Sequence, residues 1–396
     1  MAAGERWDVF CRVVDNYGDV GVSWRLARQL ALDHGKPVRL WLDDLTVLGK
    51  LRPELDTRYD LQTLEKVEVA RLAEPFVQVD DVADVVVETF GCDPPDPYVL
   101  AMAERGPKPR WVNLEYLSAE DWVEGSHALP SPNPRLPLVK HYFFPGFTPR
   151  TGGLLRERGL LERREAFQSD AGAQAAFWRS VAGRVPPANA LKVSIFSYAG
   201  APFDTLVRSV GGYPGPVWLV VPEGAASTAL SGREPAHATI RRNRQDGGNR
   251  REVEIVVVPF LQQDRYDMLL WACDVNFVRG EDSFVRAQWA ARPFVWHIYP
   301  QEDGAHWVKL AAFLRRYTDA LDRSRAAAVT GLWEAWNRRE GDVPGKAAPP
   351  ALGEAWAAFI ARREALQEHA QAWCRTQSER PDLCSQLVLF ADKMLK

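Results

Sequence analysis

Short apolar segments alternate with helical patterns along this chain, and the alternation occurs twice. In the first half we expect a helix at about residues 20–34 and strands at residues 7–14, 38–42, 85–89 and 110–114. In the second half we expect strands at residues 191–197, 217–221, 254–259, 275–278 and 294–298. Strands that alternate with helices are typical of a mostly parallel, doubly wound sheet. We therefore predict an α/β fold with two such sheets, each in its own domain.

The length of 396 residues and the hydrophobic content of 46% suffice for two hydrophobic cores. Pro186-Pro187 marks the boundary that we expect between them. The expected domains are residues 1–184 and residues 185–375, with a C-terminal helix at 376–396 that packs back on the first domain. Residues 129–151 are interpreted as an ordered loop and residues 223–252 as a polar surface excursion.

Charge and cysteine content exclude several classes of protein. The net charge is −3, with 49 basic and 52 acidic residues, so we expect no direct nucleic-acid partner. No apolar run has the length of a membrane span, and the first residues do not form a signal peptide. The five cysteines are scattered without a CxxC pair, which indicates a reducing compartment. We expect a cytoplasmic protein without a membrane partner.

The first polar cluster lies between the strand at residues 7–14 and the following helix. It contains Asp15, Asn16, Tyr17, Gly18 and Asp19. Ligands of doubly wound folds bind at this end of the strands, and a glycine lets the backbone approach a bound group closely. Two carboxylates at a helix start favour a cation or a hydroxyl group over a phosphate. In the alternative interpretation, one aspartate begins a turn and the other caps the helix.

The second polar cluster is Arg279-Gly280-Glu281-Asp282-Ser283, between the strand at residues 275–278 and a helical run. Free N–H groups at the helix start, together with the hydroxyl of Ser283, would bind a diphosphate. Arg279 would add charge-assisted hydrogen bonds. Glu281 and Asp282 would point toward sugar hydroxyls or toward the other substrate. The alternative is a helix cap with an ion pair on the surface.

Aromatic residues follow two further strands of the second half. Phe196 and Tyr198 alternate with a serine, so both rings should face the same side. Phe260 is suited to stacking on a nucleobase and Gln263 to bonding its edge, although Phe260 is equally suited to a core position.

Three histidines, His141, His297 and His306, lie in aromatic surroundings without the spacing of metal ligands. We interpret them as packing or orienting groups and expect no metal site.

Five long segments of the chain resemble one known family. They are DNYGDVGVSWRLARQL (15–30), WVNLEYLSAEDWV (111–123), FFPGFTPRTGGLLRE (143–157), PFLQQDRYDMLLWACDVNFVRGEDSFVRAQWA (259–290) and RPFVWHIYPQEDGAHWVKL (292–310). They are similar to the EarP family of protein-arginine rhamnosyltransferases, which modify translation elongation factor P. The similar segments occur in order and span both expected domains.

The resemblance implies a GT-B-type fold, in which two Rossmann-like domains face each other across a cleft. It implies an inverting, metal-independent transfer of rhamnose, with no further cofactor. The donor would be TDP-β-L-rhamnose and the acceptor one arginine of elongation factor P, which the modification activates. By the same resemblance Asp15, Asp19 and Glu281 would be catalytic. The donor would contact Asn16, Tyr17, Gly18, Phe196, Tyr198, Phe260, Gln263, Arg279, Gly280, Asp282 and Ser283.

The chemistry of an arginine acceptor suits paired carboxylates. A guanidinium is a poor nucleophile because it stays protonated, with a pKa of about 12.5 or higher. Two carboxylates can hold its planar fork, and one of them, by hypothesis Asp19, takes a proton during or after the attack. Asp15 or Glu281 would orient the guanidinium or a sugar hydroxyl.

Two other classes of function remain open at this stage. A GT-B-like sugar-nucleotide epimerase, or a transferase with another acceptor, would share the donor loop but would work without elongation factor P. A non-catalytic protein would bind the nucleotide sugar or the translation factor without turnover.

Overall fold

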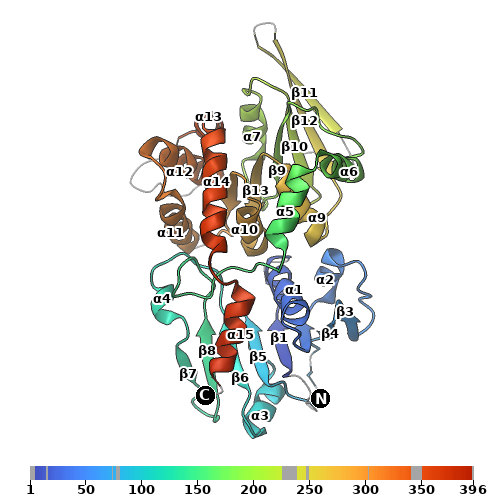
Figure 1. Ribbon diagram of the computed structural model, residues 1–396, viewed down its shortest axis with the longest axis vertical. Coiled ribbons are helices and arrows are strands. Elements are labelled where there is room, and N and C mark those ends of the chain that lie inside the picture. Colours follow the sequence, from blue (N-terminus) through green and yellow to red (C-terminus); the bar gives the residue numbers. More distant parts are fainter. Residues whose placement is uncertain are drawn as a thin grey trace. The chain divides into compact units, whose positions relative to one another are not determined.

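The computed structural model describes residues 5–14, 17–73, 75–76, 81–224, 239–246, 249–301, 303–339 and 350–394. The chain forms two compact units, Met1–Leu160 with Gln377–Lys396, and Leu161–Thr376. Each unit contains one β-sheet with helices packed against it (Figure 1).

The expected boundary after residue 184 lies inside the second unit. Helices α5 (Leu160–Ser169) and α6 (Ala171–Ala182) precede Pro186-Pro187 but pack on the second sheet. Trp178 of α6 lies edge-to-face on Trp218, with 5.4 Å between ring centroids. These contacts join residues far apart in sequence, so the proline pair alone does not mark where the first core ends.

The first unit contains an eight-stranded sheet of order β3-β4-β2-β1-β5-β6-β8-β7. The strands are β1 (Trp7–Cys11), β2 (Val38–Leu42), β3 (Leu61–Leu64), β4 (Val67–Arg71), β5 (Val85–Thr89), β6 (Arg110–Leu114), β7 (Pro130–Pro132) and β8 (Val139–Phe143). The helices are α1 (Tyr17–Leu32), α2 (Leu45–Leu51), α3 (Asp96–Glu104), α4 (Val123–Ser126) and α15 (Leu383–Lys393). The six inner strands, β4-β2-β1-β5-β6-β8, are parallel to one another. The edge strands β3 and β7 are antiparallel to their neighbours.

The central strands of the first unit match the sequence prediction closely. Strands β2, β5 and β6 have the expected bounds, and every residue in them is buried, as in the central strands of a parallel sheet. The loop expected at residues 129–151 is wrong in part, since it contains β7 and β8. These strands belong to the sheet edge, where short and half-exposed segments carry little apolar signal.

The second unit contains a six-stranded sheet of order β11-β12-β10-β9-β13-β14. The strands are β9 (Leu191–Ile195), β10 (Val217–Pro222), β11 (Thr239–Asp246), β12 (Asn249–Val258), β13 (Val275–Arg279) and β14 (Phe294–His297). Its other helices are α7 (Phe203–Val210), α9 (Gln263–Ala272), α10 (Gly280–Trp289), α11 (Ala305–Thr318), α12 (Arg323–Asn337), α13 (Leu352–Ile360) and α14 (Arg363–Ser378). All pairs in the sheet are parallel except β11 with β12.

Residues 239–252 do not form the loop that the polar composition predicted. They form β11 and the first part of β12, a hairpin that extends beyond the other strands (Figure 1). A pattern of hydrophobic alternation could not identify this hairpin, because its sequence is mostly polar. The rest of the predicted excursion, residues 225–238 with 247–248, lies outside the described residues.

Both sheets reverse their strand order beside a central strand. In the first unit β2 lies on one side of β1 and β5 on the other, and in the second unit β10 and β13 flank β9 in the same way. In doubly wound folds, ligands bind at the carboxyl ends of the strands at this point of reversal. The segments that follow β1, β5, β9 and β13 therefore define where a site is expected in each unit.

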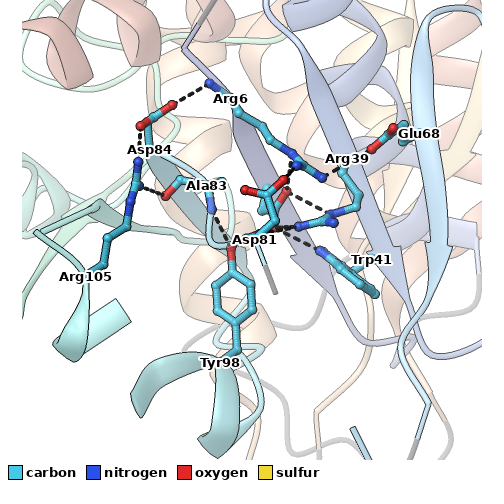
Figure 2. Close-up of polar contacts among 10 residues, drawn as sticks. Arg6, Arg39, Trp41, Glu68, Asp81, Ala83, Asp84, Tyr98 and Arg105 are labelled. Carbon is cyan, nitrogen blue, oxygen red and sulfur yellow. Dashed lines mark hydrogen bonds and ion pairs between the residues drawn. The ribbon is translucent and has the colours of Figure 1, made fainter. Parts of the chain in front are cut away.

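A buried ion-pair network holds the amino-terminal end of the first sheet (Figure 2). Asp8 of β1 is fully buried and pairs with Arg39 of β2 through two bonds, Nε to Oδ1 at 3.1 Å and Nη2 to Oδ2 at 2.6 Å. The hydroxyl of Tyr98 and the indole of Trp41 donate to the same carboxylate at 2.7 and 3.2 Å. Tyr98 belongs to α3, so one aspartate connects two strands and the helix packed on them.

We predict that Asp8→Asn lowers the free energy of unfolding of the first unit by about 3 kcal/mol, because it leaves the guanidinium of Arg39 buried without a counter-charge. Urea denaturation of the full chain measures this change. Asp60→Asn is the matched control, since it removes a 2.6 Å ion pair with Arg71 from an exposed position. Equal losses in the two variants would contradict the prediction.

Candidate functional site

Asp19 lies in the first turn of α1, and its carboxylate is buried. Its side chain reaches back to the preceding loop, where Oδ2 accepts a hydrogen bond from the backbone N–H of Val14 at 2.9 Å. The hydroxyl of Tyr116 donates to Oδ1 at 3.4 Å. Only 2% of the Asp19 residue surface is exposed. The carboxylate is thus held at both of its oxygens. The bond from Val14 comes from the preceding loop and not from an N–H of α1, so the alternative interpretation of Asp19 as the helix cap stays a prediction.

Buried polar contacts hold helix α1, which carries Asp19, in place. Ser23 lies 3.1 Å from the hydroxyl of Thr89 in β5, and Arg25 pairs with Glu157 at 3.0 Å. All of these side chains are buried. Tyr17 and Gly18 form the start of the helix, whereas Asp15 and Asn16 lie outside the described residues.

Two aromatic side chains lie at the same end of the first sheet. Phe90 follows β5 and Tyr116 follows β6, and their rings stack with 4.4 Å between centroids and 19° between planes. Phe90 has a φ of 58°, a left-handed conformation that is uncommon outside glycine and that concentrates at functional sites. Tyr116 is 36% exposed, so the edge of the sheet presents an accessible ring directly beside a buried carboxylate.

Arg279, the last residue of β13, contacts two aromatic residues that follow β9 in the second unit. Its guanidinium carbon lies 4.6 Å from the ring centroid of Phe196 and 4.6 Å from that of Tyr198. The prediction that these two rings face the same side is therefore confirmed. Cation–π contacts of this kind hold a guanidinium in place without neutralising its charge. The arrangement presents a fixed positive charge at the carboxyl end of the sheet.

The start of α10 is shaped by Gly280 and Ser283. Gly280 has a φ of 62°, which a residue with a Cβ adopts only with strain. The hydroxyl of Ser283 accepts from the backbone N–H of Arg279 at 3.1 Å and donates to the carbonyl of the same residue. In this conformation the serine hydroxyl bonds both backbone groups of the residue directly before α10.

Carboxylates accompany the positive charge at this helix start. Glu281 and Asp282 are half-buried in the first turn of α10. The amide of Gln263, at the start of α9, donates to Asp282 at 3.1 Å. Phe260 precedes α9 and is half-buried. The structure thus brings Gln263 and Asp282 together, while the roles of these residues toward a donor stay predictions.

His297 contacts both the backbone and the ring of Tyr198. Its Nδ1 accepts the backbone N–H of Tyr198 at 3.2 Å, and the two rings lie edge-to-face at 5.4 Å. Burial lowers the pKa of His297 to about 3, and nearby Arg339 and Arg279 act in the same direction. The imidazole is therefore neutral at physiological pH, which an acceptor role at Nδ1 requires. The interpretation of this histidine as an orienting group fits these contacts.

No group of three or more His, Cys, Asp or Glu side chains is placed to hold a metal ion in the part of the chain that the structure describes. Within the same residues, no helix has the length and apolarity needed to cross a membrane.

The fold is that of a known class of enzymes. A solved structure of a glycosyltransferase from Rickettsia africae matches with a TM-score of 0.53, covers 99% of each chain and is 10% identical. A second solved structure shows the basis for EarP-mediated arginine glycosylation of translation elongation factor EF-P. It matches this chain with a TM-score of 0.66. It covers 98% of this chain and 99% of its own and is 34% identical. The chain is a GT-B-type glycosyltransferase.

The particular family follows from the sequence over nearly the whole chain. Residues 7–392 match the family of the elongation-factor P (EF-P) rhamnosyltransferase EarP. A protein-arginine rhamnosyltransferase of Pseudomonas putida is 46% identical over 97% of this chain and 98% of its own length. The chain belongs to the EarP family, and the resemblance seen in its five segments is confirmed.

The sequence analysis did not single out Tyr116 or Phe90. Both follow strands whose bounds were predicted well, and position directly after a strand is the signal that would have found them. Their proximity to Asp19 depends on the neighbouring order of β1, β5 and β6, which the sequence did not give.

We predict that the pH dependence of stability changes in His297→Gln, which keeps an acceptor for the N–H of Tyr198. A folded-state pKa below that of the unfolded chain means that stability is lost as the pH falls from about 6.5 toward 3. The loss from this one group is about 1.4 kcal/mol per pH unit. Unfolding free energies at pH 7, 6 and 5 should therefore fall more steeply in the wild type. Parallel curves for the two proteins would refute this assignment.

Proposed function

We propose that this protein transfers rhamnose from TDP-β-L-rhamnose to an arginine side chain of elongation factor P, with inversion and without a metal ion. The single observation that carries the proposal is the guanidinium of Arg279, fixed over two aromatic rings at the start of a helix. A relative named protein-arginine rhamnosyltransferase, similar over almost the full length, supports the sugar and the acceptor. We expect the reaction in the cytoplasm, where a translation factor is available.

The second unit suits the donor. A diphosphate carries negative charge that Arg279 and the N–H groups at the start of α10 are suited to bind. The half-buried ring of Phe260, near the start of α9, is suited to the base. Glu281 and Asp282 would lie toward the sugar because like charge keeps them from the phosphates. The leaving group would then be stabilised by one guanidinium and by helix dipoles.

The first unit suits the acceptor. Asp19 accepts hydrogen bonds from Val14 and Tyr116, and a carboxylate oxygen can accept more than one hydrogen bond. It would accept an N–H of the arginine guanidinium and then take its proton. Asp15 would hold a second N–H, and Glu281 is the alternative for that role.

In the proposed step, an arginine nitrogen forms a bond to the anomeric carbon. The bond from that carbon to the diphosphate oxygen breaks, and its electron pair leaves with TDP. Attack from the face opposite the diphosphate inverts the configuration. The nitrogen gives up one proton to Asp19, so the product arginine carries the sugar and the carboxyl later releases the proton to water.

The proposal is tested by the intact mass of unmodified elongation factor P after incubation with the protein and TDP-rhamnose. We expect a gain of one deoxyhexose, equal TDP release, and no change when a chelator is present. Replacing the acceptor arginine with lysine should abolish the gain. Turnover of the nucleotide sugar in the absence of the protein acceptor would favour the epimerase, and donor binding without any product would favour a binding protein.

We predict that Asp19→Asn lowers kcat at least about 100-fold, because the amide cannot accept the proton, while donor affinity stays within twofold. With its amide oxygen toward Val14, the asparagine keeps the bond from that N–H, and its amide NH2 donates to the hydroxyl oxygen of Tyr116 instead of accepting from it. Single-turnover rates and calorimetric titration with TDP-rhamnose measure the two quantities. Near-normal turnover in Asp19→Asn would remove this residue from the role of base.

We predict that Arg279→Lys weakens donor binding about tenfold, since a lysine keeps the charge but loses the planar contacts with Phe196 and Tyr198. Arg208→Lys, an exposed position on α7 of the same unit, is the control and should leave binding unchanged. Calorimetry compares both variants with the wild type. Equal affinities in all three proteins would contradict a donor role for Arg279.

A further inference from the structure

We propose that Tyr116 is a positioning residue for the transfer reaction, acting through Asp19, and that its ring with Phe90 receives the acceptor guanidinium. The inference rests on the proposed role of Asp19 as base. It extends that role to a hydroxyl and a ring pair that none of the sequence motifs had assigned.

The first step is the orientation of the carboxylate. Asp19 accepts hydrogen bonds on both oxygens, from Val14 on Oδ2 and from Tyr116 on Oδ1. A backbone donor and a phenol from two separate loops thus fix the plane of the carboxylate and the direction in which its oxygens point. A base that must take a proton from a planar fork depends on this direction.

The second step is the rigidity of the loop that carries the hydroxyl. The backbone N–H of Glu115 donates to Phe143 at 3.0 Å, and that of Phe90 donates to Leu114 at 2.8 Å. The strands before these loops pair in register, with Thr89 opposite Leu114. Figure 1 shows β1, β5 and β6 as neighbours in the first unit. Tyr116 is therefore held by two adjacent strands rather than by a loose connection.

The third step is the exposure of the ring. Asp19 is 2% exposed and Tyr116 is 36% exposed, so the ring is the accessible part of this pair. Stacking on Phe90 at 4.4 Å, with planes 19° apart, fixes the ring orientation. Guanidinium groups stack on aromatic faces and keep their edge N–H groups for carboxylates. An arginine placed on this ring would have an aromatic face and a buried carboxylate side by side.

The hydroxyl contact between Tyr116 and Asp19 has room to shorten. At 3.4 Å the bond from Tyr116 to Asp19 is longer than the usual 2.7–2.8 Å for two oxygens. Hydrogen bonds of catalytic groups often shorten only when the substrate is bound. The hydroxyl would then donate fully when the carboxylate engages the guanidinium.

The test separates the hydroxyl from the ring. Tyr116→Phe keeps the ring, and we expect kcat to fall about tenfold with the KM for elongation factor P within twofold of the wild type. Tyr116→Leu also removes the stacking face, and its KM should rise about tenfold in addition. Tyr59→Phe, an exposed tyrosine of the same unit, should behave as wild type. Circular dichroism melting curves establish that each variant is folded.

A double-mutant cycle decides whether the hydroxyl acts through Asp19. In the Asp19→Asn background, single-turnover rates over long incubations should show no further loss on adding Tyr116→Phe. A full additional tenfold loss in that background would overturn the inference, and so would wild-type kcat in Tyr116→Phe while Asp19→Asn is inactive. Full activity of Asp19→Asn would instead overturn the base on which the inference rests, and absence of any mass gain with the wild-type protein would overturn the proposed function itself.

Discussion

The reversal of strand order beside β1 and β9 is the constraint on which the candidate site residues of each unit depend. Because parallel strands end at the same edge of a sheet, the segments after β1, β5 and β6 meet, and so do those after β9 and β13. Asp19 and Tyr116 come from separate segments of one unit, as do Phe196 and Arg279 of the other. No local sequence feature brings these pairs together.

The two helix starts at these edges differ in their charged groups. The start of α1 contains a carboxylate that reaches back to the N–H of Val14, so the positive end of the helix dipole and a backbone donor both stabilise a negative charge. The start of α10 combines Arg279 with two carboxylates, Glu281 and Asp282. A protein that transfers a sugar from a nucleoside diphosphate to an arginine needs groups for a cation as well as groups for an anion.

The sequence predicted the central strands and the second polar cluster because both are local. Strand β5 begins with three consecutive valines, and the polar cluster from Arg279 to Ser283 lies where a strand meets a helix. The domain boundary expected after residue 184 and the loop expected at residues 223–252 depend instead on contacts between residues far apart in the sequence. Helix α6 joins the second unit through Trp178, and β11 is a strand because it pairs with β12. Tyr116 was missed for the same reason, since its partner Asp19 is far away in the chain.

The rings that contact the guanidinium of Arg279 are uncharged. Tyr198 lies between the guanidinium and His297, whose ring accepts a backbone N–H and whose pKa burial lowers to about 3. A protonated imidazole here would repel Arg279 and could not accept the bond that holds Tyr198. The strand that ends in His297 is in turn followed by Ile298, whose N–H donates to the buried side chain of Asn337 at 3.0 Å. The guanidinium of Arg279 therefore lies on uncharged rings with Glu281 and Asp282 in the adjoining helix turn, and a cation fixed in this way is suited to stabilising a departing diphosphate.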